Sequence, residues 1–290
     1  MEELDMKISD NGKNAVVPAL YLCATPIGNM EDMTLRVIKT LGAVDAIYAE
    51  DTRNTLKLLN RFGIKKPLVS CHEHNEAMRA AEIVERIRTG EAVAFVSDAG
   101  MPGISDPGGR LISACTESGT PFFVLPGASA ALLAHVMANL STEYRFVGFL
   151  PREKGECKKK LLSLSDCDCP MVFYESPLRV AKTVALMLES FGERNAVLVR
   201  ELTKLYESMT RGTLSSLVER YSDTPPKGEC VLVVDGRRKA EQTNIDPETV
   251  LTELLGSGKS AKDSAKELAA RGIMPKNEAY ALALRIAERL

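Results

Sequence analysis

Apolar and polar positions alternate in two rhythms along the first half of the chain. Short, mostly apolar runs typical of strands lie at 19–24, 44–49, 67–71, 92–97 and 121–125. Between them, apolar positions recur at helical spacing, which predicts helices over 33–41, 52–63, 75–90 and 109–118 and another opened by "PGASA" at 126–130. Five strands alternating with helices predict an α/β domain with a mainly parallel sheet.

Two of these helices carry sequence signals for their ends. Gly63 is expected to cap the C-terminus of the helix over 52–63. Asn75 is a candidate N-cap for the next helix, and Gly90 is its expected stop. The apolar face predicted for that helix consists of Ala77, Ala81, Val84 and Ile87.

The second half begins a new set of strands and helices after a polar linker at 139–145. Strands are predicted at 146–150, 171–175, 196–201 and 230–235, with helices at 156–163, 177–190 and 213–221. Composition changes at 236–247, and only helical patterns follow, at 247–256, 260–271 and 276–290. These patterns predict a leader at 1–17, α/β domains at 18–139 and 140–238, and a helical tail at 247–290.

The tail has the outline of a helix-turn-helix, with a glycine-containing turn between its last two helices. The alternative is a small helical appendage that packs or dimerises. The leader is polar and unpatterned, so we expect it to be mostly disordered.

Composition narrows the class of protein without naming a partner. The chain of 290 residues is long enough for two domains, and its 45% hydrophobic and 26% charged residues are typical of a soluble globular protein. A net charge of −2 means that any polyanion must meet a local basic patch. Seven scattered cysteines indicate reduced thiols and a cytoplasmic location, and no apolar run is long enough to span a membrane.

Several familiar chemistries are excluded by missing motifs. The first strand is followed by "TPIGNMED" rather than G-x-G-x-x-G, and Gly103 and Gly108 are followed by Gly109 and Arg110 instead of the lysine and hydroxyl of a phosphate loop. "CHEHNE" at 71–76 supplies too few separated ligands for a closed zinc site, so we expect no metal. No G-x-S-x-G elbow is present for a serine hydrolase.

The candidate site therefore consists of turns that follow the predicted strands. In open α/β sheets ligands bind outside the carboxyl ends of strands, and four small-residue turns lie there, at 25–29, 50–54, 97–109 and 126–130. The carboxylates of Asp98 and Asp106 disfavour phosphate and suit a cationic, hydroxyl-rich ligand. A sulfonium cofactor that carries a ribose has both properties.

Ordered motifs between residues 19 and 238 resemble the tetrapyrrole methylase superfamily, and within it the ribosomal RNA cytidine 2′-O-methyltransferases of the bacterial small subunit. These motifs are "ATPIGNMEDMTLR", "AEDTRNT", "HEHNE", "SDAGMPGISDPG", "PGASA", "FYESPLR", "RELTKLYE" and "KGE". The resemblance implies two α/β domains with S-adenosylmethionine in the cleft between them, and a homodimer. It also implies 2′-O-methylation of a cytidine in the decoding region, with ribosomal RNA or the small ribosomal subunit as partner.

The resemblance also implies roles for particular residues. Those expected to line the cofactor site are Pro26, Asp98, Gly100, Met101, Gly103, Ile104, Ser129, Ala130, Tyr174, Glu175, Gly228 and Glu229. The chain departs from the family where it has Ser97-Asp98-Ala99 in place of Gly-Asp-Pro, with extra residues after it, and where Cys71 replaces an aromatic residue.

A ribose 2′-hydroxyl is a weak acid, so a carboxylate that faces the cleft is expected to act as general base. The first candidates are Asp106, Glu175 and Asp51, with Asp98 and Glu201 as further ones, and the alternative for each is helix capping or loop hydrogen bonding. The residues expected to contact substrate RNA are Arg53, Ser105, Arg179 and Lys204, and the alternative for the cationic ones is an ion pair with a neighbouring carboxylate.

Two rival functions remain open from the sequence. One is a tetrapyrrole methylase of the precorrin type, which acts on a small molecule. The other is a non-enzymatic RNA-binding or ribosome-assembly factor that keeps the same fold.

Overall fold

The computed structural model describes residues 16–237, 246–271 and 273–289. The chain divides into two compact units, Met1–Gly236 and Arg237–Leu290. Of the predicted leader, residues 1–15 lie outside the described part of the chain, as do 238–245 within the predicted change of composition. Near the first described residue, the backbone N–H of Val17 donates to the Tyr21 hydroxyl at 3.0 Å and so holds this segment against β1 (Leu20–Cys23).

The first sheet is entirely parallel and has the strand order β3-β2-β4-β1-β5. Its strands are β1 (Leu20–Cys23), β2 (Ala46–Ala49), β3 (Leu68–Ser70), β4 (Val93–Val96) and β5 (Phe122–Leu125). All five lie within the predicted runs, and the three central strands are buried throughout, as expected for a sheet covered on both faces.

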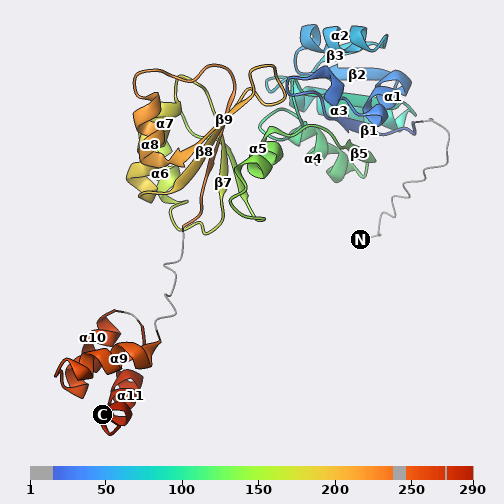
Figure 1. The fold of residues 1–290 in the computed structure, drawn as a ribbon. Helices are drawn as coiled ribbons and strands as arrows, with labels where there is room; N and C mark the ends of the chain where they lie inside the picture. Colours follow the sequence, from blue (N-terminus) through green and yellow to red (C-terminus); the bar gives the residue numbers. More distant parts are fainter. Residues whose placement is uncertain (1–15, 238–245, 272, 290) are drawn as a thin grey trace. The chain divides into compact units, whose positions relative to one another are not determined.

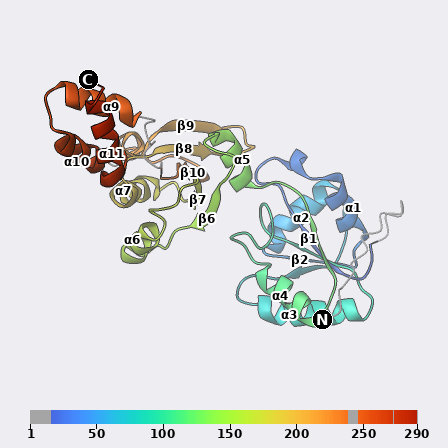
Figure 2. The ribbon, with the colours of Figure 1, turned by 90° about the horizontal axis from the view of Figure 1, so that it is seen from below.

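Helices cover both faces of this sheet (Figure 2). α1 (Leu35–Ala43) and α2 (Thr52–Arg61) pack on the face that carries Tyr21 and Cys23. α3 (Glu76–Arg88) and α4 (Gly109–Ser118) pack on the face that carries Leu20 and Leu22. A short 3-10 turn, Met30–Asp32, precedes α1. The strict alternation along β1 divides the domain core into two layers.

The predicted apolar face of α3 is partly wrong. Val84 and Ile87 are buried, but Ala77 and Ala81 are exposed, and the buried face instead runs through Glu76, Ala80 and Ile83. Asn75 precedes the helix without capping it, because its side chain accepts from the backbone N–H of His72 at 2.7 Å. Small alanines gave a misleading pattern, since they fit an exposed helical surface as well as a buried one.

The second sheet is mixed and has the order β6-β7-β10-β8-β9. Its strands are β6 (Arg145–Phe149), β7 (Met171–Glu175), β8 (Asn195–Arg200), β9 (Ser208–Thr213) and β10 (Cys230–Val234). Only β6 and β7 pair in parallel; the other pairs are antiparallel. β9 was not predicted, because this edge strand has no buried residue and its sequence, "SMTRGT", is polar.

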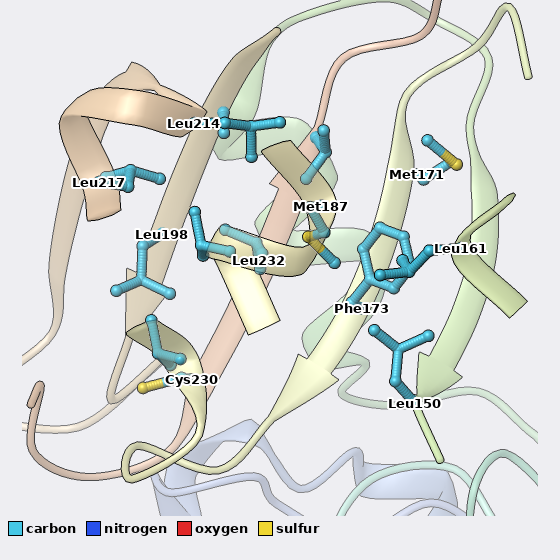
Figure 3. Close-up of a cluster of buried hydrophobic side chains, with 14 of the residues drawn as sticks. Leu150, Leu161, Met171, Phe173, Met187, Leu198, Leu214, Leu217, Cys230 and Leu232 are labelled. Atoms are coloured by element: carbon cyan, nitrogen blue, oxygen red, sulfur yellow. The ribbon is translucent and has the colours of Figure 1, made fainter. Parts of the chain in front are cut away.

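Three helices cover one face of the second sheet, and a fourth covers the other. α6 (Lys154–Leu162), α7 (Val180–Phe191) and α8 (Leu214–Tyr221) enclose the core shown in Figure 3, where Leu161, Phe173 and Leu232 meet. α5 (Ala130–Ala138) packs Ala134 and its neighbours against the opposite face. Helices on both faces of both sheets confirm the predicted α/β class.

The position of α5 concerns the boundary predicted at residue 139 between the two α/β domains. The domain boundary itself stays a prediction. α5 precedes that division in sequence, yet its small residues pack on β7 and β10 of the second sheet (Figure 1). The chain therefore crosses from one sheet to the other in the "PGASA" turn at 126–130, before the polar linker.

The second unit consists of α9 (Pro247–Gly256), α10 (Ala261–Ala270) and α11 (Lys276–Ala287), which agree with the helices predicted there. Its own small core is built around Leu251, Leu268 and Ala283. No helix in the described ranges combines the length and apolarity that crossing a membrane requires.

The second-sheet core offers a paired test of packing on α6. Leu161 is 0% exposed and its neighbour Leu162 is 52% exposed. We expect Leu161→Ala to lower the free energy of unfolding by about 2–5 kcal/mol, because it leaves a cavity. Leu162→Ala should change it by less than about 0.5 kcal/mol. Urea titration measures both, and equal losses would contradict the assigned packing.

Candidate active site

Two loops of the first sheet are joined at its carboxyl edge. The backbone N–H of Thr25, after β1, donates to the carbonyl of Gly100, after β4, at 2.9 Å, and the reverse bond is 3.0 Å. On either side of this pair lies a pocket. Both pockets therefore lie outside the carboxyl ends of parallel strands, beside the turns selected from the sequence, and binding of a ligand there stays a prediction.

The larger pocket has a volume of about 440 Å³, within the range of small-molecule sites, which is about 300–1,000 Å³. Loops of both sheets and the start of α5 line it. Its residues are Ile27, Ala99, Gly100, Met101, Ile104, Ser105, Asp106, Ser129, Ala130, Phe149, Tyr174, Glu175, Ser176, Pro177, Gly228, Glu229, Cys230 and Val231.

The smaller pocket has a volume of about 240 Å³ and lies between the first-sheet loops and α2. It is lined by Thr25, Pro26, Gly28, Met30, Asn54, Thr55, Lys57, Leu58, Ser97 and Asp98. The two pockets share a wall, which is formed by residues 25–28 and 97–101. Within each of these segments some residues line the smaller pocket and others line the larger one.

The loop over 97–109 is held in an unusual backbone conformation. Gly103 and Gly108 have φ of 80° and 134°, and a Cβ on Gly108 would lie 2.9 Å from the Gly103 nitrogen. Ser105 has φ of 64° without being glycine, a strained state that clusters at functional sites. The buried Glu76 carboxylate fixes the end of the loop, since its Oε1 accepts from the N–H groups of Gly108 at 2.8 Å and Arg110 at 2.9 Å.

Asp106 is the pocket carboxylate best suited to accept a proton. Burial raises its pKa to about 7, and the nearby charges of Glu50 and Asp98 contribute to the rise. No side-chain hydrogen bond or ion pair of Asp106 occurs among the described residues. A carboxyl with a pKa near neutrality is the type of group that enzymes use as an acid or base.

Glu175, the second candidate base, is occupied by structural contacts. Its Oε1 accepts from the backbone N–H of Ser176 at 2.8 Å, and its Oε2 accepts from the Thr183 hydroxyl at 2.7 Å. Arg179 lies 3.3 Å from Oε1 and also donates to the carbonyls of Leu150 and Pro151. This arrangement favours the alternative weighed for both residues: Glu175 and Arg179 lock the end of β7 to the start of α7.

Asp51, the third candidate base, caps α2. Its Oδ1 accepts from the Arg53 backbone at 2.8 Å, and its Oδ2 lies 2.6 Å from the Arg53 guanidinium. Hydrogen bonds from Arg53 lower the pKa of Asp51 to about 2, which makes it a poor proton acceptor at neutral pH. The Arg53 side chain remains 86% exposed, so it can still reach a phosphate.

The turn after β8 lines neither pocket, but it lies close to Glu229 of the larger pocket and Gly28 of the smaller one. The Glu201 Oε1 accepts from the Glu229 backbone at 2.8 Å and from the Lys204 ammonium at 3.0 Å, and these bonds lower the pKa of Glu201. Lys204 also lies 3.4 Å from Glu229. Glu201 and Thr203 have φ of 52° and 65°, so this turn, like the loop over 97–109, stores backbone strain.

The larger pocket brings together most of the residues predicted to bind a cofactor. Pro26 and Asp98 lie in the smaller pocket instead, and Gly103 lines neither. Arg53, Arg179 and Lys204 line neither pocket. The lining residues that sequence reasoning missed are Ile27, Ala99, Phe149, Ser176, Pro177, Cys230 and Val231. All adjoin predicted positions or strand ends, so extending each motif to its neighbours would have found them.

The "CHEHNE" segment, considered above as a metal site, leads into α3. Cys71 is buried, and the His72 backbone is held by Asn75. Within the described ranges, no three or more His, Cys, Asp or Glu side chains are arranged as ligands for a metal ion.

Gly228 offers a test of the pocket's backbone. Its φ is 82°, and a Cβ there would lie 2.3 Å from the Glu201 carboxyl. Gly228→Ala should therefore destabilise the protein by about 1–3 kcal/mol. Gly42→Ala is the matched control in helix α1, where nothing lies within 4 Å of the added Cβ, and should stabilise by about 0.5–1 kcal/mol. Urea titration measures both, and a neutral Gly228→Ala would contradict the assigned backbone.

Comparison with known proteins gives consistent results for sequence and fold. The chain is 41% identical to Ribosomal RNA small subunit methyltransferase I of Bacillus subtilis, over 96% of this chain and 97% of that protein. It is 38% identical to the protein of the same name from Synechocystis, over 92% and 98%.

Among solved structures, uroporphyrin-III C-methyltransferase of Thermus thermophilus, complexed with S-adenosylhomocysteine, superposes with a TM-score of 0.55. The match covers 75% of this chain and 97% of that one at 16% sequence identity, so it supports the fold alone.

The family model for tetrapyrrole (corrin/porphyrin) methylases matches residues 19–218, which include both sheets apart from β10 and every segment that lines the smaller pocket. Together with the near-full-length relatives, this match establishes that the chain belongs to the tetrapyrrole methylase family.

Proposed function

We propose that this protein is an S-adenosylmethionine-dependent methyltransferase that acts on the RNA of the small ribosomal subunit. The observation that carries the proposal is 41% identity, over 96% of the chain, to a protein named for that activity. The site chemistry agrees, because the larger pocket combines an apolar wall, conformationally special glycines and one carboxyl that can take a proton.

The larger pocket suits the proposed cofactor. Tyr174 and Phe149 stand edge to face at 5.5 Å and supply an aromatic wall for a purine ring. Ser129 starts α5 without using its side chain as a cap, which leaves its hydroxyl for a ligand. Asp106 and Glu229 bring negative charge toward a sulfonium. When bound, the cofactor supplies an electrophilic methyl group.

The protein's own contribution is alignment and proton acceptance. An in-line displacement needs the 2′-oxygen behind the methyl group, about 3–3.5 Å from it. We propose that Asp106, which lines the larger pocket, takes the hydroxyl proton as the oxygen attacks. We further propose a cytidine of the decoding region as the acceptor, and the cytoplasm as the place of action, where ribosomes are assembled.

We also propose that the protein works as a homodimer. α5, "AALLAHVMA", has no charged residue and is apolar on both sides. One side packs on the second sheet, while Leu132, Leu133 and Val136 are 50%, 37% and 65% exposed. A helix that is apolar all round is normally buried, and a second copy of the chain would cover this face.

The proposed function is tested by methyl transfer from labelled S-adenosylmethionine. Purified protein should methylate small subunits isolated from a strain that lacks this gene, and mapping should find a single 2′-O-methylcytidine. A precorrin should accept no label. Transfer to the precorrin instead would establish the small-molecule activity, and cofactor binding without any transfer would favour the assembly factor.

Asp106→Asn tests the proposed base. The wild-type rate should rise with pH and level off above an inflection at or below about 7, since a bound cation can only lower the raised pKa. The variant should lose about 10²–10⁴-fold in kcat together with that inflection.

Glu229→Gln is the matched control for Asp106→Asn, because it removes another pocket carboxylate and should keep the inflection. Initial rates at saturating cofactor, measured from pH 5 to 9, decide the assignment. An unchanged profile in Asp106→Asn would remove this residue from the mechanism.

Val136→Glu tests the proposed dimer. A charge on the exposed face of α5 should convert the dimer into monomers, because a buried unpaired carboxylate is costly. Leu35→Glu, at a 75% exposed position at the start of α1, should leave the dimer intact. Light scattering after gel filtration reports the mass, and a monomeric wild-type protein would contradict the proposal.

A further inference from the structure

The smaller pocket lies outside the larger pocket proposed above for the cofactor, yet it is built into the same wall. Pro26 and Gly28 face it while Ile27 faces the larger pocket, and Asp98 faces it while Ala99 faces the larger one. Consecutive Cα atoms are only about 3.8 Å apart. A ligand in the smaller pocket is therefore a close neighbour of one in the larger pocket.

We propose that the smaller pocket receives the base of the nucleotide that is methylated. The inference rests on the proposed function and adds a site for the acceptor to it. Proteins that read RNA by sequence take single-stranded bases out of the stack and bind their polar edges with hydrogen bonds.

The first support is a buried hydroxyl without a partner. Ser97 lines the pocket and is 1% exposed, its carbonyl accepts from Thr25, and its Oγ has no hydrogen-bond partner among the described residues. A buried polar atom without a hydrogen-bond partner costs free energy. A ligand or water that bonds to it removes that cost.

A second unpartnered hydroxyl lies just behind the pocket wall. The Thr203 Oγ1 is buried and unpaired within the described part of the chain, and a Cβ on Gly28 would lie 3.0 Å from it. The same Cβ would lie 2.5 Å from the Lys204 Cγ. Gly28 therefore lets the turn after β8 approach the pocket closely.

The polar groups of the pocket match the edge of cytosine. That edge offers an amino donor and two acceptors, and carboxylates are suitable partners for the amino group. Asp98 supplies a carboxylate, while the Asn54 amide and the Ser97 hydroxyl supply donors. Asn54 is exposed, and its present bond to Asp98 is long, at 3.4 Å, so it can be exchanged for a ligand bond.

The surroundings suit a single-stranded RNA. Lys57 lies at the pocket and Lys204 beside it, where cations can meet the flanking phosphates. Leu205 and Tyr206 follow in the same turn and are 88% and 72% exposed. An exposed aromatic ring such as that of Tyr206 can stack an unpaired base.

Asn54→Ala and Ser97→Ala test the proposal, with Asn60→Ala on the exposed side of α2 as the matched control. Each pocket variant should raise KM for small subunits about tenfold, since one hydrogen bond to the base is lost. The dissociation constant for S-adenosylmethionine should stay at the wild-type value. Ser97→Ala should not lower Tm, because the hydroxyl it removes has no partner in the free protein.

Reconstituted subunits with uridine at the mapped cytidine give the second readout. The wild-type protein should prefer cytidine by at least about tenfold, and Asn54→Ala should reduce that preference, while Asn60→Ala keeps it. Pocket variants that behave like Asn60→Ala would overturn the proposal, although wild-type methylation would still support the proposed function. Loss of cofactor affinity in Asn54→Ala would assign the pocket to the cofactor and also overturn it.

Discussion

The paired hydrogen bonds between Thr25 and Gly100 are the constraint on which the site depends. They join the loop after β1 to the loop after β4 at the edge of a parallel sheet, where strands themselves no longer pair. The joined loops form the wall shared by both pockets. The buried Glu76 carboxylate holds the end of the loop over 97–109, where it accepts from two backbone N–H groups. Hydrogen bonds therefore fix the wall at both ends.

The distribution of charge around this wall explains how an acidic protein can handle RNA. The chain carries a net charge of −2, and carboxylates gather at the carboxyl edge of the first sheet. Arg53 pairs with Asp51 and Lys204 with Glu201, which leaves cations on the rim and carboxylates within. Phosphates can meet the rim while the interior stays suited to a cation.

Sequence reasoning predicted the fold well because strands buried on both faces leave an unmistakable apolar run. It failed for β9, a polar edge strand, and for the buried face of α3, where alanines carry little information. It selected glycine-rich turns after strands as the candidate site, and both pockets lie at such turns. It left Asp51 and Glu175 open between a general base and a capping or hydrogen-bonding role, because the sequence does not show which way a carboxylate points. The structure has Arg53 and Thr183 bonded to them, two and eight residues along the chain.

In the proposed mechanism, the raised pKa of Asp106 gives the pocket a means of distinguishing the cofactor from its spent form. Because burial raises its pKa to about 7, this carboxyl can bind or release a proton near neutral pH. A sulfonium favours its ionised state, so binding of the cationic form is coupled to proton release. After the methyl group has left, the sulfur is neutral, and the same carboxyl holds the proton that it took from the hydroxyl. Both partners of the charge attraction that favoured the cofactor are then neutral when the product must depart.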